Sequence, residues 1–233
     1  MREESSAYII NLKAGTLKEE YAYKAFEAGK RDGNMRNIKV LAFRNSRCLK
    51  LNAKIRKKVM GLTDMTPIVG EEMVANTAIN NATKDQVLIS NNQMVIVKEV
   101  EKTESHGLQG AFILYEDLEG NLIEETVFVP QSPERLQERL NKLKNEAKKL
   151  RSEGRDEESK ERWRHFYHLK ESCADIRFTY AMTVNKAQGV TLKHVLIDLD
   201  DINTCREREQ KIRLAYTAVT RATDYVTIEG NLD

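Results

Sequence analysis

The chain has 233 residues, of which 32% are charged and 40% are hydrophobic, and its formal net charge is +2 at pH 7. This composition is typical of a globular protein with one large or two small domains, and it excludes an intrinsically disordered chain. The nearly neutral charge argues against a purely electrostatic, histone-like nucleic-acid binder, so any such binding must come from local basic patches.

The sequence shows no targeting segment and no cysteine pattern typical of disulfide or zinc sites. No apolar run is long enough to span a bilayer, and the segment Met1–Glu4 does not resemble a signal peptide, so we expect a cytoplasmic protein with no membrane partner. Cys48, Cys173 and Cys205 are scattered and form no C-x-x-C pair. We therefore expect neither a disulfide framework nor a zinc site.

The N-terminal part of the chain predicts a strand and two helices around a second, buried strand. Tyr8–Ile10 has the composition of a short strand, and Leu17–Ala28 that of a helix closed by Gly29. Ile38–Phe43 has the continuous apolar pattern of a buried strand.

The second helix follows this buried strand directly. Asn45 and Ser46 supply a cap for it, and Gly61 ends it. Its apolar positions are expected to face inward: Leu49, Ile55 and Val59.

From about Pro67 to Pro130 the apolar pattern changes to a period of two, with turn residues between the segments. The predicted strands are Val87–Ile89, Met94–Val97, Ala111–Tyr115 and Leu122–Val129. Several short antiparallel strands in a stretch of this length predict a small barrel or sandwich.

A helical stretch follows. Ser132 and Pro133 give a helix-start signal, and a charged helix is expected to about Arg151, with a break at Gly154. A second helix carries Trp163, Phe166 and Tyr167, whose spacing favours a core stripe packed on the β insertion. Base stacking beside the neighbouring basic residues is the alternative interpretation: Arg162, Arg164 and Lys170.

Residues 176–228 predict strand, polar turn, strand, helix and strand, and two segments of this stretch carry chemistry. Thr183–Thr191, TVNKAQGVT, places a hydroxyl, a carboxamide, a cation and a glycine just beyond an apolar strand, where open α/β sheets bind ligands. Leu214–Ala222, LAYTAVTRA, ends an apolar-faced helix with Arg221, a residue type suited to bidentate phosphate recognition.

The two segments resemble motifs V and VI of superfamily 1 helicases, T-x-H/N-K-x-Q-G-x-T and Y-x-A-x-T-R-A, and they occur in the same order. The likeness is strongest to the phage Dda helicases of the RecD-like branch, and Val40–Ser46 with its following helix resembles motif IV. The resemblance implies the C-terminal half of a helicase in a bacterial or phage-infected cytoplasm, with roles in DNA replication, recombination and repair. The implied fold is α/β, a RecA-like parallel sheet (residues 1–66 and 172–233) interrupted by an SH3-like β-barrel with a helical extension (67–171).

The resemblance also implies a nucleotide-facing set of residues. Arg221 would be the arginine finger that reaches the γ-phosphate of ATP held by another domain, and Gln188 and Gly189 would approach the nucleotide. Without the motif context, Arg221 is an ordinary solvated arginine near a helix C-terminus and Gly189 marks a strand-end turn.

A second set would face DNA. Thr183, Asn185 and Lys186 correspond to the part of motif V that holds sugar and phosphate, although many relatives have histidine at the position of Asn185. From motif IV, the candidates for contacts to backbone phosphates at a helix N-terminus are Arg44, Asn45 and Ser46. Dda-like sequences usually have threonine in place of Arg44, and capping of the sheet edge is the alternative interpretation for this segment.

Acidic residues after the apolar run Leu196–Ile197 imitate a magnesium-binding Walker B strand. A genuine Walker B accompanies a Walker A sequence, G-x-x-x-x-G-K-[ST], and the chain contains none. We therefore interpret Asp198, Asp200 and Asp201 as loop and cap residues and expect no metal site.

The resulting hypothesis is the C-terminal portion of an ATP-dependent 5′→3′ DNA helicase, with single-stranded DNA and an N-terminal RecA-like half as partners. That half would hold most of the ATP and Mg²⁺, so the isolated chain is expected to be inactive as an ATPase. Two alternatives stay open. One is a non-enzymatic module that binds single-stranded nucleic acid, and the other is a regulatory fragment that associates with a complete helicase.

Overall fold

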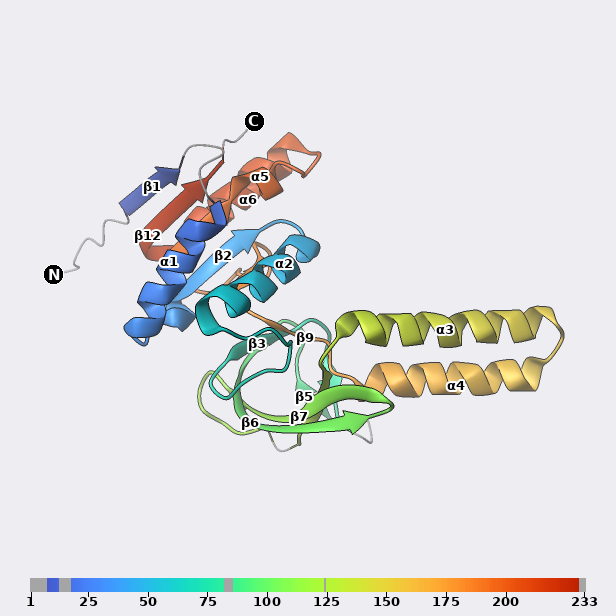
Figure 1. Ribbon diagram of the computed structural model, residues 1–233. Coiled ribbons are helices and arrows are strands. Elements are labelled where there is room, and N and C mark those ends of the chain that lie inside the picture. The colour runs from blue at the N-terminus through green and yellow to red at the C-terminus, as the bar shows by residue number, and fades with distance from the viewer. Residues whose placement is uncertain (1–7, 13–17, 82–85, 124, 231–233) are drawn as a thin grey trace. The chain divides into compact units, whose positions relative to one another are not determined.

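The computed structural model describes residues 8–12, 18–81, 86–123 and 125–230, and the chain forms two units (Figure 1). The parallel-sheet unit comprises Met1–Thr63 and Phe178–Asp233, and the inserted unit comprises Asp64–Arg177. The boundaries expected from the sequence, after residues 66 and 171, differ from these by a few residues. Leu17 and Glu124, which belong to two of the predicted elements, lie outside the described residues.

The parallel-sheet unit contains a five-stranded sheet in the order β1-β12-β11-β2-β10, and all its strand pairs are parallel. The predicted α/β class with a parallel sheet is confirmed. Every residue of β2, which lies between β11 and β10, is buried, as expected for a strand covered on both faces. The strands are β1 (Tyr8–Leu12), β2 (Ile38–Ala42), β10 (Ala181–Thr183), β11 (Leu192–Asp198) and β12 (Ala222–Glu229).

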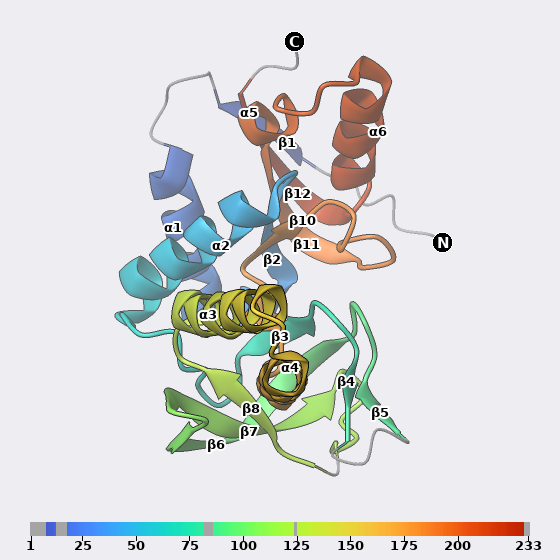
Figure 2. The same ribbon diagram turned by 90° about the vertical axis from the view of Figure 1, so that its right-hand side faces the viewer.

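Helices cover both faces of this sheet. Figure 2 shows α1 and α2 on one side of the sheet and α6 on the other, and α6 contacts β11 and β12. The bounds are α1 (Lys18–Arg31), α2 (Asn45–Ile55), α5 (Leu199–Ile202) and α6 (Arg208–Val219), with a 3₁₀ turn η1 at Met35–Asn37 and a π-helical turn η2 at Arg56–Met60. Among the described residues, no helix has the length and apolar character needed to cross a membrane.

Three local predictions in this unit are wrong. Gly29 does not end α1, which continues to Arg31; a Cβ at Gly29 would lie 2.5 Å from the Cδ1 atom of Ile38, so the glycine permits close packing. Leu49 is 37% exposed, although Ile55 is fully buried as expected. Helix α2 begins at Asn45 without a side-chain cap from its own segment. The helical segment formed by α2 and η2 ends at Gly61, which has a φ of 74°, in agreement with the prediction.

The inserted unit contains a sheet in the order β8-β7-β6-β3-β9 and a separate ladder of β4 and β5. The strand predicted at Val87–Ile89 is β5; β6 and β7 are longer than predicted, and β8 is shorter. An SH3-like identity for this β-structure stays a prediction. The other bounds are β3 (Glu72–Ala75), β4 (Ile79–Asn80), β6 (Met94–Ser105), β7 (Leu108–Asp117), β8 (Val127–Pro130) and β9 (Ile176–Phe178).

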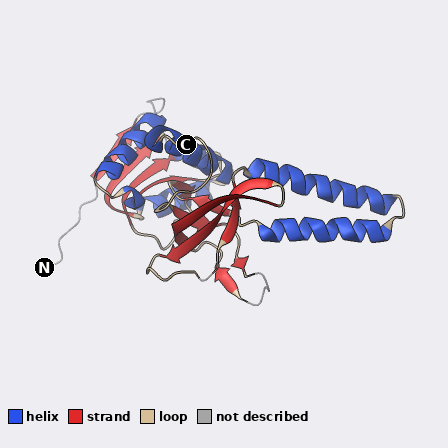
Figure 3. Cartoon of the chain, turned by 60° about the horizontal axis from the view of Figure 1, so that its bottom comes forward, coloured by secondary structure: helices blue, strands red, loops and turns tan. Residues whose placement is uncertain are grey.

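Two antiparallel helices complete the inserted unit, α3 (Pro133–Ser152) and α4 (Asp156–Ser172), and Figure 3 shows them as a long hairpin. The predicted start is confirmed, because the Ser132 side chain accepts a hydrogen bond from the Arg135 backbone N–H at 3.2 Å. The hairpin packs on the sheet through a core cluster with which Phe166 is in contact: Leu108, Phe128, Leu140, Leu169 and Cys173.

Candidate functional site

The predicted DNA-facing residues gather at the carboxyl end of the parallel sheet. Thr183 is the last residue of β10 and lies opposite Ala42, the last residue of β2. Immediately after this last strand pair, the backbone N–H of Val184 donates a hydrogen bond to the Ala42 carbonyl at 3.0 Å. Because the segment that contains Arg44, Asn45 and Ser46 begins just beyond Ala42, two segments 140 residues apart meet at one edge.

A tight turn after β10 presents Asn185 and Lys186. The backbone N–H of Lys186 donates to the Thr183 carbonyl at 3.0 Å. Val184 and Ala187 are buried and anchor the turn, whereas Asn185 is exposed and Lys186 is half-buried. The polar side chains of this turn therefore stand on an apolar base at the sheet edge.

Lys186 also lies near the first turns of α2. Burial raises the pKa of the Cys48 thiol in α2 to about 12; the charge of Asp201 adds to this rise and that of Lys186 opposes it. Both charges therefore lie close enough to Cys48 to affect its ionisation. The ammonium group of Lys186 thus belongs to the same surface region as the helix N-terminus beside Ser46.

Asp201 supplies the cap that the sequence of α2 lacks. One carboxylate oxygen accepts hydrogen bonds from the backbone N–H groups of Phe43 (2.9 Å) and Arg44 (2.8 Å). The other oxygen accepts from the Arg44 guanidinium, at 2.6 Å from Nε and 2.5 Å from Nη2. Asp201 itself is 3% exposed. Arg44 is therefore already engaged by a carboxylate, and Asn45 and Ser46 are the first-turn residues that remain open to a ligand.

A second acid extends this network. Asp198 accepts from the Arg47 guanidinium at 2.8 Å and from the Asp201 backbone N–H at 3.0 Å, so it caps α5. Arg47 also pairs with Glu19 of α1 at 3.4 Å, and Glu19 accepts from Lys54 at 2.6 Å. The network ties α1, α2 and the end of β11 to one another.

These acids are poor candidates for a magnesium site. The carboxylates of Asp198 and Asp201 are buried and already accept hydrogen bonds from arginine and backbone donors. Within the described part of the chain, no group of three or more histidine, cysteine or acidic residues could hold a metal ion. Their observed role is to cap helices and orient the two arginines.

Arg221 lies at the opposite end of the same sheet. It lies two residues beyond the end of α6 and immediately before β12, and its carbonyl accepts from the N–H of Leu192, the first residue of β11, at 2.9 Å. Its guanidinium donates to the Thr217 carbonyl at 3.3 Å and to the Thr220 hydroxyl at 3.2 Å, and both are neutral oxygens. These contacts satisfy groups at the helix end, and because their acceptors are uncharged they are weaker than bonds from a guanidinium to a carboxylate or a phosphate.

Gln188 and Gly189 belong to the connection between these two ends. Residues 184–191 lead from the carboxyl end of β10 to the amino end of β11, and both residues are exposed. Gly189 has a φ of 83°, which favours glycine whatever the surrounding space. Because β11 has seven residues, Arg221 and Arg44 are separated by roughly 20 Å along the sheet and cannot contact the same phosphate.

The structure thus divides the predicted site residues into a carboxyl-end set and an amino-end set. The carboxyl-end set contains Thr183, Asn185, Lys186, Asn45 and Ser46, with Arg44 bound to Asp201. The amino-end set is Arg221, with Gln188 and Gly189 on the connection that leads to it. The role of Asp201 as a partner of α2 was missed, because its only sequence signal is an acid after an apolar strand.

Comparisons with known proteins agree with the sequence resemblance. Residues 178–228 match the family model of the UvrD-like helicase C-terminal domain. This segment includes both motifs, and the predicted resemblance to the C-terminal half of a superfamily 1 helicase is confirmed. No curated protein matches the chain significantly.

Solved structures of Pif1 helicases are similar to the chain at low identity. The Pif1 helicase from Candida albicans is 13% identical with a TM-score of 0.43, and the match covers 89% of this chain and 53% of that one. The Bacteroides Pif1 bound to ssDNA is 10% identical with a TM-score of 0.36, with 89% and 48% covered. The chain therefore spans about half the length of these structures.

Proposed function

We propose that the chain is the C-terminal portion of an ATP-dependent DNA helicase, which supplies an arginine finger and part of a single-stranded DNA track. The single observation that carries this proposal is the family match over residues 178–228, which includes both chemically active segments. Most of the ATP and Mg²⁺ would be held by an N-terminal RecA-like half. The 5′→3′ polarity is proposed by analogy with the Dda-like family.

The contacts of Arg221 support its role as the finger. A finger must leave its resting contacts and stabilise negative charge that develops on a phosphoryl group held elsewhere. The resting partners of Arg221 are two neutral oxygens at 3.2 and 3.3 Å, so a phosphate would replace uncharged acceptors by a negatively charged one that the guanidinium binds more strongly. Gln188 and Gly189 would approach the same nucleotide.

The carboxyl-end set supports a track for a nucleic-acid backbone. Lys186 supplies a cation, Ser46 supplies an exposed hydroxyl and Thr183 a buried one, Asn45 and Asn185 supply amides, and the start of α2 supplies backbone N–H groups. Such groups dominate contacts to sugar and phosphate. In this proposal Arg44 acts mainly through its bonds to Asp201, which hold the start of α2 beside β10.

The position of the polar turn suggests how the two activities would be coupled. Residues 184–191 join the DNA-facing end to the nucleotide-facing end through a short connection with a buried base at Val184 and Ala187. A displacement of Gln188 and Gly189 on ATP binding would therefore be transmitted to Asn185 and Lys186. Domain closure and reopening would then move the strand by this route.

The test is DNA-stimulated ATP hydrolysis by the chain alone and after mixing with an N-terminal half that contains a Walker A sequence. We expect no hydrolysis alone and hydrolysis on mixing, which Arg221→Ala abolishes. Arg213→Ala is the matched control, because Arg213 is an exposed arginine of α6 that pairs with Glu209 at the surface. Strong hydrolysis by the chain alone, or a mixture insensitive to Arg221→Ala, would contradict the proposal.

A non-enzymatic module that binds single-stranded nucleic acid is the second candidate. It is favoured by the carboxyl-end set, whose hydroxyls, amides and cation all come from this chain, whereas Arg221 needs a nucleotide held by another protein segment. Salt-dependent binding of single strands that survives Arg221→Ala, together with no hydrolysis in any mixture, would establish the module instead.

A further inference from the structure

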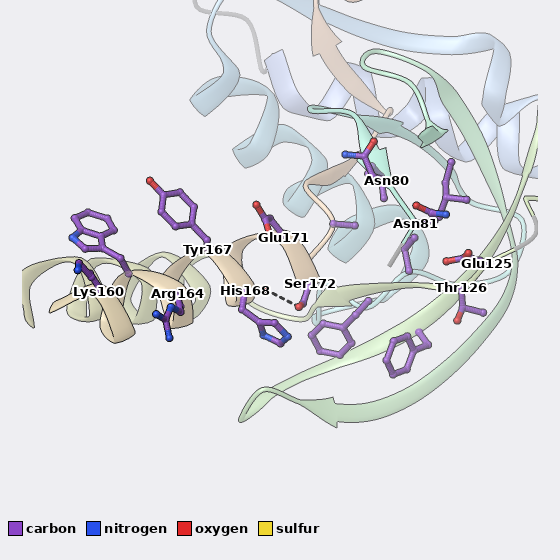
Figure 4. A pocket seen from close by; sticks show the side chains of 17 residues that line it. Asn80, Asn81, Glu125, Thr126, Lys160, Arg164, Tyr167, His168, Glu171 and Ser172 are labelled. Atoms are coloured by element: carbon purple, nitrogen blue, oxygen red, sulfur yellow. Dashed lines mark hydrogen bonds between the residues drawn. The ribbon is translucent and has the colours of Figure 1, made fainter. Parts of the chain in front are cut away.

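The inserted unit has a groove of about 820 Å³ between α4 and the strands β4, β7 and β8 (Figure 4). Its volume lies within the range of about 300–1,000 Å³ that is typical of ligand pockets. All its lining residues belong to the inserted unit. The groove therefore shares no lining residue with the two residue sets of the parallel sheet.

Aromatic rings form one wall and the floor of the groove. Trp163 and Tyr167 stand one helical turn apart on α4, with ring centroids 5.9 Å apart and an angle of 30° between the ring planes. Tyr167 is 52% exposed, and Phe112 on the floor is 36% exposed. Phe166, by contrast, packs against the core of the unit. The core therefore uses one aromatic residue of the predicted stripe and leaves the other two beside the groove.

Polar groups around the rings provide both cations and hydrogen-bonding amides. Lys160 and Arg164 are one turn apart on α4, and Figure 4 shows Asn80 and Asn81 across the groove from this helix. Lys160 pairs with Glu157 at 2.7 Å, but both side chains are exposed. Pairs of this kind contribute little and exchange readily for a phosphate.

We propose that this groove binds unpaired nucleotides of a single-stranded nucleic acid. A base would stack on the ring of Tyr167 or Trp163, Lys160 and Arg164 would contact the backbone phosphates, and Asn80 and Asn81 would face the base edge. Flat rings interleaved with basic side chains are the combination that single-strand binding proteins use. An apolar peptide would match the rings but would make no contact that uses the charge of Lys160 or Arg164.

Two acidic residues in the lining narrow the choice of base. Glu125 and Glu171 contribute carboxylates, which accept hydrogen bonds from exocyclic amino groups such as N4 of cytosine. A strand of deoxycytidine is therefore the probe that suits the groove. The inference goes beyond the proposed function and does not depend on ATP hydrolysis.

Tryptophan fluorescence of the full chain tests the proposal directly, because Trp163 is the single tryptophan. We expect an oligodeoxycytidine of about 12 nucleotides, within the site sizes of single-strand binders, to quench this fluorescence. A duplex of the same length has its bases stacked and is expected to quench little. DNA binding detected by anisotropy without a change in Trp163 fluorescence overturns the proposal, as does no response to DNA at all.

Variants of the groove locate the effect. Tyr167→Ala is expected to lower the affinity for the oligodeoxycytidine, measured by the quenching titration, about 5- to 150-fold, because one stacked base is lost. Circular dichroism checks that the fold is retained. Leu118→Ala, a change of a 57% exposed apolar residue in the same unit, is the control and should leave the titration unchanged. Equal titrations for wild type and Tyr167→Ala overturn the proposal.

Charge variants separate this site from the parallel-sheet unit. Lys160→Gln combined with Arg164→Gln should reduce the slope of log K against log salt by about 1.4, from two phosphate contacts, whereas Lys142→Gln with Lys148→Gln on α3 should not change it. Lys186→Ala in the parallel-sheet unit should leave the quenching of Trp163 intact. The test of the groove therefore does not depend on whether the proposed DNA track of the parallel-sheet unit is correct. Loss of quenching in Lys186→Ala but not in Tyr167→Ala overturns the proposal.

Discussion

The two ends of the parallel sheet differ in how firmly their charged groups are held. At the carboxyl end, Asp201 and Asp198 bind Arg44, Arg47 and the start of α2 through charge-assisted hydrogen bonds of 2.5–2.9 Å. At the amino end, the Arg221 guanidinium donates two hydrogen bonds of 3.2 and 3.3 Å to uncharged oxygens. The first end is suited to present a fixed surface, and the second to release a cation toward a partner.

The largest effect that tests this contrast is expected at Arg221. In a reconstituted two-part helicase, Arg221→Ala should lower the rate of ATP hydrolysis about 10³-fold or more, as for other arginine fingers. The urea-unfolding free energy of the chain should change by less than about 0.5 kcal/mol, because only neutral contacts at a helix end are lost. A loss of about 2–3 kcal/mol in the free energy of unfolding, the value expected for Asp201→Ala, would show that Arg221 mainly stabilises the fold.

Asp201 should behave in the opposite way. Asp201→Ala removes the acceptor for two backbone N–H groups and a guanidinium, so we expect a loss of about 2–3 kcal/mol in the free energy of unfolding. Urea denaturation measures it, with Asp200→Ala as the control on the exposed neighbouring residue. Equal effects of the two substitutions would mean that the cap of α2 contributes little.

Lys186 tests the binding surface itself. Lys186→Ala is expected to weaken single-stranded DNA binding by about 1 kcal/mol and to lower the salt slope by about 0.7, one phosphate contact. Lys193, an exposed lysine near the amino end of β11, provides the matched control Lys193→Ala. Fluorescence anisotropy of a labelled strand at several salt concentrations measures both. A larger loss of affinity in Lys193→Ala than in Lys186→Ala would place the DNA track at the amino end of the sheet and contradict the proposal.

The smallest expected effect concerns pH and Glu19. Burial tends to raise the pKa of Glu19, but hydrogen bonds from Lys54 and Tyr23 and the charge of Arg47 outweigh it, so the pKa is lowered from 4.5. A lowered folded-state pKa stabilises the fold above pH 4.5, and this contribution disappears as the pH falls through the folded-state pKa. Because the group is partly exposed, we expect a few tenths of a kcal/mol.

Thermal unfolding between pH 7 and pH 3 checks this prediction. Glu19→Gln should lower stability slightly at pH 7 and show a smaller difference from wild type at pH 3. Glu20→Gln is the control, because Glu20 makes an exposed pair with Lys24. A difference from wild type that grows toward acid would contradict the assigned sign.

Short-range sequence signals predicted several parts of the structure correctly. Ser132 caps α3, Gly61 ends the helical segment that begins with α2, and the strand at Val87–Ile89 has the predicted bounds. The turn after Thr183 also follows its local pattern, with apolar Val184 and Ala187 beneath polar neighbours. Each of these features depends on residues a few positions apart, whose geometry the backbone determines.

Other features failed to follow from local patterns. Leu49 has the spacing of an inward position but is exposed, and the aromatic stripe of α4 was expected to pack as one core. Only Phe166 joins that core, while Tyr167 borders the groove. Helical spacing specifies which residues share a face, but the partner of that face decides how much of it is covered.

The sequence by itself determined the α/β pattern, the two motif segments and the residue types placed at each strand end. The tertiary structure decided which strand ends are neighbours: β2 lies between β11 and β10, although residues 43–180 separate it from β10 in the chain. This order brings Asp201 to the start of α2 and places Arg44 on a carboxylate. The physical reason is that hydrogen bonds between parallel strands align residues far apart in sequence, so their charges meet only after the sheet has formed.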